Sequence, residues 1–148
     1  MPRTHIVAPG KAVSCGTLVR SARGELLLGH ATNTDHWDIP KGLQEAGESA
    51  LRATQRELFE ETGLVFADSE FQDLGLFVYR QDKMLHLFKV QATPSLDSLD
   101  TLHCTSFFPH HRTGKPTPEM DRYCWARREQ VSQLCAPRMA AQILALDW

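Results

Sequence analysis

Three glutamates crowd into little more than one turn of a predicted helix, and their spacing suits chemistry on a charged substrate. They are Glu57, Glu60 and Glu61, and they directly follow Arg56. Carboxylates three and four residues apart share one helix face and repel one another. The ordinary explanation is a solvated face held by an Arg56–Glu60 pair. The chemical explanation is a hard divalent cation such as Mg²⁺ or Mn²⁺, because these ions prefer oxygen ligands.

The residues around the cluster favour the chemical explanation. A loop from Gly42 to Gly47 leads into the helix, and Gly63 follows it. Ala50 and Ala53 lie on the glutamate side, where small side chains would leave room in front of the carboxylates. Three carboxylates about 6 Å apart do not all stay ionised at low cost without a counter-cation. We therefore expect metal-assisted chemistry on a phosphate ester or anhydride.

The helix that carries the glutamates should have a defined start and end. We expect it to run from about Glu48 to Thr62, with Gly47 capping its start and Gly63 in a left-handed conformation at its end. The stripe expected to face the core consists of Leu51, Thr54 and Leu58.

Apolar runs on both sides of this helix predict strands. The expected strands cover residues 12–20, 25–30, 73–80, 84–92, 102–108 and 122–126. The first two and the next two should form hairpins, residues 37–41 a short extended piece, and residues 109–121 a polar loop. A C-terminal helix is expected over residues 130–146, with a break at Pro137. This order predicts an α+β fold built as an α/β/α sandwich.

The composition is that of an ordinary globular chain. Hydrophobic residues make up 42% and charged residues 23% of the 148, with a formal net charge of −2. We expect one domain over residues 1–148, no bulk binding of nucleic acid, and a small phosphorylated partner. No apolar run suits a membrane span or a signal peptide. The four scattered cysteines predict reduced thiols and a cytoplasmic location.

The stretch from Gly42 to Leu64 resembles the signature of the Nudix hydrolase family. That signature is Gly, five residues, Glu, seven residues, Arg-Glu, an aliphatic, any residue, Glu-Glu, any residue, Gly and an aliphatic. The chain meets it without departure at Gly42, Glu48, Arg56, Glu57, Leu58, Glu60, Glu61, Gly63 and Leu64. A chance match is on the order of 10⁻⁷ at average residue usage. The resemblance implies a mixed sheet between helices and a divalent cation, Mg²⁺ or Mn²⁺, as cofactor.

The resemblance also implies roles for the matched residues. Glu57 and Glu61 would be the principal metal ligands, and the carbonyl of Gly42 would approach the ion. Glu60 would be a further ligand or the base for the attacking water. Arg56 would orient a glutamate by a charge-assisted hydrogen bond. The implied reaction is attack of a water on one phosphorus of a pyrophosphate link.

One more carboxylate in this family lies outside the signature, at a position that varies. Glu119 is our first choice, because a junction between loop and strand could bring it over the metal, and Asp121 is the second. A surface carboxylate is the alternative for each. Glu48, inside the signature, either binds through water or is structural.

The lead-in from His36 to Gly42 carries the hypothesis on substrate. It resembles the W-x-x-P-K-G of the branch that acts on diadenosine polyphosphates and diphosphoinositol polyphosphates. Lys41 would then reach a phosphate oxygen, and Trp37 would be either a core residue or a platform for a base.

A second substrate-binding candidate is the loop at residues 107–116. Its side chains with positive or titratable charge are His110, His111, Arg112 and Lys115. They could cradle a polyphosphate, or the loop could simply be solvated. Tyr123, Phe107 or Phe108 could stack on an adenine.

Together these features predict a metal-dependent hydrolase of a nucleoside diphosphate linked to another group. The leading substrate is a dinucleoside polyphosphate such as diadenosine tetraphosphate. The alternatives are a housecleaning nucleoside triphosphate pyrophosphatase, an RNA 5′-pyrophosphohydrolase and a nucleotide sensor without catalysis. The sequence leaves the oligomeric state and the number of metals open.

Overall fold

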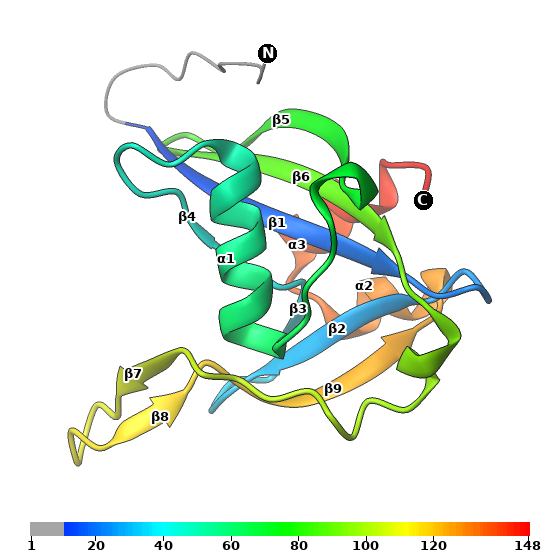
Figure 1. Ribbon diagram of the computed structural model, residues 1–148. Helices are drawn as coiled ribbons and strands as arrows, with labels where there is room; N and C mark the ends of the chain where they lie inside the picture. The colour runs from blue at the N-terminus through cyan, green and yellow to red at the C-terminus, as the bar shows by residue number, and fades with distance from the viewer. Residues whose placement is uncertain (1–10) are drawn as a thin grey trace.

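Helices flank both faces of a mixed sheet (Figure 1). The computed structural model describes residues 11–148, so the first ten residues of the predicted 1–148 domain lie outside the described part. One face is covered by α1 (Ala50–Thr62), and the other by α2 (Val131–Leu134) and α3 (Pro137–Leu144). The predicted α/β/α sandwich is confirmed, as is the break of the C-terminal helix before Pro137.

The long strand β1 (Ala12–Arg20) runs through the middle of the sheet. One edge pairs in parallel with β6 (Lys83–Gln91), which pairs with the antiparallel β5 (Gln72–Arg80). The other edge pairs antiparallel with β4 (Lys41–Leu43) and, at Arg20, with β2 (Leu26–Ala31). This arrangement confirms both predicted hairpins and holds β4 beside the N-terminal half of β1.

The remaining strands extend the sheet and add a small second one. Strand β2 also pairs with β3 (Trp37–Asp38) and with β9 (Met120–Ala126). A separate hairpin consists of β7 (Phe107–Pro109) and β8 (Pro116–Pro118). Short 3-10 helices lie at Asp68–Glu70, Pro94–Asp97 and Arg128–Gln130. Within residues 11–148, no helix is both long and apolar enough to cross a membrane.

Strand β1 is buried on both faces, and this explains its nearly continuous apolar sequence. Val13 and Cys15 pack with Ala53 under α1. Leu18 belongs to the larger core under α2 and α3. The core therefore fixes α1 directly over β1, with its first turns above the start of that strand.

Three local predictions are wrong. Helix α1 is capped by Ser49, whose hydroxyl accepts a hydrogen bond from the Arg52 amide at 3.1 Å, and not by Gly47. Residues 102–106 are not a strand, because their backbone bonds to the end of α1, as Thr105 N does to Glu60 O at 2.6 Å. Residues 109–121 are not one loop, because they contain β8 and the start of β9.

Candidate metal and catalytic site

Helix α1 points its glutamate face at the sheet. Its C-terminal cap is Gly63, at φ 80°, as predicted. Ala53 is fully buried against β1, and Ala50 packs on the same cluster. The prediction that these alanines leave room in front of the carboxylates is therefore wrong. They let the helix approach β1, and Glu57 and Glu61 are buried as a result.

Glu57 lies directly on the backbone of Gly42. A Cβ at position 42 would stand 2.1 Å from the Glu57 Cδ and 2.2 and 2.3 Å from its two oxygens. Only glycine leaves space for the carboxylate there. Burial raises the pKa of Glu57, against the lowering effect of Arg56, and repulsion from Glu60 and Glu119 raises it further.

Glu61 is the most deeply buried carboxylate of the cluster, with 3% of the residue exposed. Its Oε1 accepts a hydrogen bond from the backbone N of Lys41 at 3.2 Å. Burial raises the pKa of Glu61 well above its usual range, and the charges of Glu57 and Glu119 add to the shift. A negative charge at this position is therefore costly until a cation arrives.

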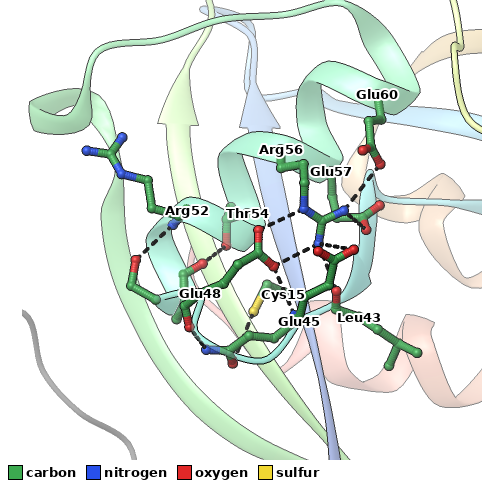
Figure 2. A network of polar contacts seen from close by, with 12 residues as sticks. Cys15, Leu43, Glu45, Glu48, Arg52, Thr54, Arg56, Glu57 and Glu60 are labelled. Atoms are coloured by element: carbon green, nitrogen blue, oxygen red, sulfur yellow. Dashed lines mark hydrogen bonds and ion pairs between the residues drawn. The ribbon is translucent and has the colours of Figure 1, made fainter.

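Arg56 joins the β4–α1 loop to the glutamates (Figure 2). It binds Glu48 in a bidentate manner, at 2.8 and 2.9 Å. It also donates to Glu57 Oε1 at 2.8 Å, to Glu60 Oε2 at 3.3 Å and to the Leu43 carbonyl at 3.0 Å. All five N–H groups of its guanidinium thus have acceptors. Arg56 therefore contacts three of the carboxylates at once. Its role in orienting a glutamate, and the water-mediated or structural role of Glu48, stay predictions.

Glu60 is more open than its two neighbours. It shares one guanidinium nitrogen of Arg56 with Glu57, and its side chain is partly exposed. A carboxylate with one shared donor and access to solvent is suited to move toward an ion or to accept a proton from water.

The structure brings Glu119 to the cluster from a distant part of the sequence. It lies between β8 and β9 and lines a cavity of about 160 Å³ with Glu61 and Lys41. The other lining residues are Ala31, Asp38, Ile39 and Met120. Asp121, the second choice, instead places its Oδ1 2.6 Å from His30 Nδ1.

Asp38 is a cavity residue that the sequence analysis missed. Its Oδ2 lies 3.1 Å from Lys41 Nζ, and its Oδ1 accepts from the Ile39 amide at 2.8 Å. Burial lowers the pKa of Lys41, but Asp38 and Glu61 together raise it above the usual value, so the lysine is charged. The i,i+3 spacing of Asp38 and Lys41 was the available signal.

Three of the other substrate-binding candidates lie in surroundings that differ from one another. Trp37 packs on the core under α3 and lies edge-on to His30, with ring centroids 5.2 Å apart. The Tyr123 hydroxyl donates to the Glu61 carbonyl. Arg112 is exposed in the turn between β7 and β8 and does not join the carboxylates. Their roles in substrate binding stay predictions.

The carboxylates fit a hard dication by their chemistry. Oxygen donors from Glu57, Glu61 and Glu119 repel one another, and the space that Gly42 leaves is filled by a carboxylate. Within residues 11–148, no three His, Cys, Asp or Glu side chains stand in a formed ligand arrangement. Binding of Mg²⁺ or Mn²⁺ by these carboxylates therefore requires side-chain movements that bring the buried Glu57 and Glu61 and the exposed Glu119 to one ion.

Comparison with known proteins agrees with the signature and the fold. A model of the NUDIX domain matches residues 10–146. The chain is 31% identical over 138 residues to an uncharacterized 17.7 kDa protein of Enterobacteria phage T4, covering 87% of this chain and 91% of that protein. It is 36% identical over 59 residues to an RNA pyrophosphohydrolase of Psychrobacter sp., covering 40% of this chain and 34% of that enzyme.

Solved structures share the fold at low identity. A MutT protein from Methanosarcina mazei superposes with a TM-score of 0.64 at 18% identity, covering 95% of this chain and 94% of that one. A C. elegans Ap4A hydrolase has a TM-score of 0.55 at 17% identity, covering 89% and 90%. With the family model spanning almost the whole chain, the protein belongs to the NUDIX family and is a hydrolase of phosphoanhydride bonds.

Proposed function

We propose that the protein hydrolyses a dinucleoside polyphosphate such as diadenosine tetraphosphate at a pyrophosphate link. The observation that carries this proposal is the shared cavity of Lys41, Glu61 and Glu119 beside Glu57. It places one ammonium group and several carboxylates around one small space. Such a space suits phosphate oxygens on one side and a cation on the other.

In this proposed reaction, each residue of the site has a separate role. Mg²⁺ or Mn²⁺ held by Glu57, Glu61 and Glu119, with the Gly42 carbonyl nearby, would neutralise phosphate charge and acidify water. Lys41, steadied by Asp38, binds a phosphate oxygen. Glu60 takes the proton of the attacking water. Arg56 keeps Glu57 in place throughout.

The sequence lead-in and the comparisons support the choice of substrate class. Residues 36–42 match the pattern of the diadenosine polyphosphate branch, and one solved neighbour is an Ap4A hydrolase. All four cysteines are free thiols, which supports the proposed cytoplasmic location.

RNA 5′-pyrophosphate removal is the second candidate, because the local identity to RNA pyrophosphohydrolases covers part of the chain.

The proposed function is tested with a panel of nucleotides in the presence of Mg²⁺, with the products separated by ion-exchange chromatography. Diadenosine tetraphosphate should yield one nucleoside monophosphate, AMP, and one nucleoside triphosphate, ATP. Release of pyrophosphate from 5′-triphosphate RNA, with the dinucleotide left intact, would favour the second candidate. Activity on mononucleoside triphosphates alone would indicate a housecleaning enzyme, and tight binding without turnover a sensor.

A further inference from the structure

The hairpin of β7 and β8 projects from the body of the molecule (Figure 1). Hydrogen bonds connect its root to residues of the candidate site. At its root the Glu119 amide donates to the Ser106 carbonyl at 2.9 Å. Thr105, which directly precedes Ser106, donates its backbone N–H to the Glu60 carbonyl at 2.6 Å. Both ends of the hairpin are thus tied to residues of the carboxylate cluster, and whatever the hairpin binds is held at a fixed place relative to it.

An apolar hollow of about 270 Å³ lies on this hairpin. Its lining consists of Phe107, Phe108, Pro109, Gly114 and Pro116. Phe107 is 54% exposed, so its ring is accessible to a ligand. The flat face of an aromatic ring in this hollow is a surface on which a nucleobase can stack, and the prolines keep the lining rigid.

The charge of the hairpin complements phosphate. Residues 101–118 contain no Asp or Glu, and the turn carries Arg112 and Lys115. Within the described residues, neither of these two cations pairs with a carboxylate. The hairpin therefore offers stacking surface and uncompensated positive charge together, next to a strongly acidic cluster.

We propose that the hairpin is the binding site for the second nucleoside of a dinucleoside polyphosphate. This proposal rests on the function proposed above. The base stacks on Phe107 in the hollow, and Arg112 and Lys115 bind phosphates of the chain that joins the two nucleosides. Strand β7 spans roughly 10 Å from the root, so the hollow is within reach of a short polyphosphate chain. Tyr123 is less suited to this role, because its hydroxyl is bonded to the Glu61 carbonyl.

The kinetic test uses the Phe107→Ala variant of the full chain, with diadenosine tetraphosphate and ATP as substrates. Removal of a stacking aromatic should raise KM for diadenosine tetraphosphate about tenfold, with a much smaller change for ATP. The matched control is Val78→Ala, because Val78 is another exposed apolar side chain, 64% exposed, on β5. Equal changes of KM for both substrates in Phe107→Ala would overturn the proposal.

A binding test separates this proposal from the proposed function. Amide chemical shifts of the non-proline residues in the range 107–116 are followed by NMR while AMP is added in the presence of a chelator, so that no hydrolysis occurs. Shifts in the hairpin that disappear in Phe107→Ala support the nucleoside site, even if no dinucleotide is hydrolysed. An unmoved hairpin at saturating AMP overturns it, even if diadenosine tetraphosphate is a good substrate.

Discussion

At the scale of single residues, Glu61 is the proposed metal ligand whose burial should lower the stability of the metal-free protein. Its carboxylate is almost fully buried and its pKa is raised well above the usual range. Glu61→Gln keeps an acceptor for the Lys41 amide but removes the buried charge. We expect turnover to fall by orders of magnitude, while Tm in chelator at pH 7.5 rises by roughly 2–4 °C per kcal/mol gained. Normal kcat in this variant would remove Glu61 from the metal site.

The sign of the pH dependence follows from the same burial. A carboxyl with a raised pKa in the folded state stabilises the fold below the unfolded pKa of about 4.3. This stability is lost as the pH rises through the folded pKa of Glu61. Glu61 should therefore make the Tm of the metal-free protein decline as the pH rises above about 4.3, whereas carboxyls with a lowered pKa, such as Glu48, act in the opposite direction. In Glu61→Gln the decline should be shallower in the same calorimetric scans.

The contact of Gly42 with Glu57 gives a second prediction at this scale. In Gly42→Ala the new Cβ would overlap the Glu57 carboxylate, so that the side chain must move. We expect kcat to drop at least tenfold, because the misplaced ligand no longer faces the ion. The control is Gly47→Ala, where no atom lies within 4 Å but φ is +84°. It should lower Tm through backbone strain of about 1 kcal/mol and leave kcat near normal. Equal kcat losses in the two variants would contradict this account.

At the scale of elements, Arg56 couples the β4–α1 loop to helix α1. Lysine keeps the charge but cannot form the fork that binds Glu48, Glu57 and the Leu43 carbonyl together. Arg56→Lys should lower kcat by at least tenfold, because Glu57 loses its fixed orientation. The expected readout is a change in kcat with little change in KM.

The same helix offers a matched control for this exchange. Arg52 forms a two-contact pair with Asp68, at 3.2 Å for each contact, on the exposed side of α1. Arg52→Lys should change neither kcat nor Tm by much, because exposed pairs contribute little. If both exchanges reduce kcat alike, Arg56 has no special positioning role.

At the scale of the whole molecule, the buried carboxylates should couple metal binding to folding. A cation that binds only the folded state adds about 2.7 kcal/mol at a hundred times its Kd. We therefore expect Tm to rise by several degrees as Mg²⁺ is added, measured by calorimetry in the absence of substrate. Glu57→Gln and Glu61→Gln should lose most of this rise. A Mg²⁺ response that is unchanged in both variants would place the ion elsewhere.

The sequence alone determined the parts of this protein that depend on local spacing. Glu57, Glu60 and Glu61 share a helix face because of the helical repeat, and Gly63 ends the helix because it adopts a positive φ easily. The order of strands and helices likewise predicted the sandwich, since each element carries its own hydrophobic pattern.

Only the tertiary structure decided which distant residues meet at the site. Strand β4 brings Gly42 under Glu57, and the junction of β8 and β9 brings Glu119 beside Glu61. Ala53 was predicted to leave room in front of the carboxylates, whereas it is packed on β1. Such contacts join residues that are far apart in the sequence, as Glu61 and Glu119 are. They depend on sheet pairing and on which helix face is buried, and no local repeat in the sequence encodes either.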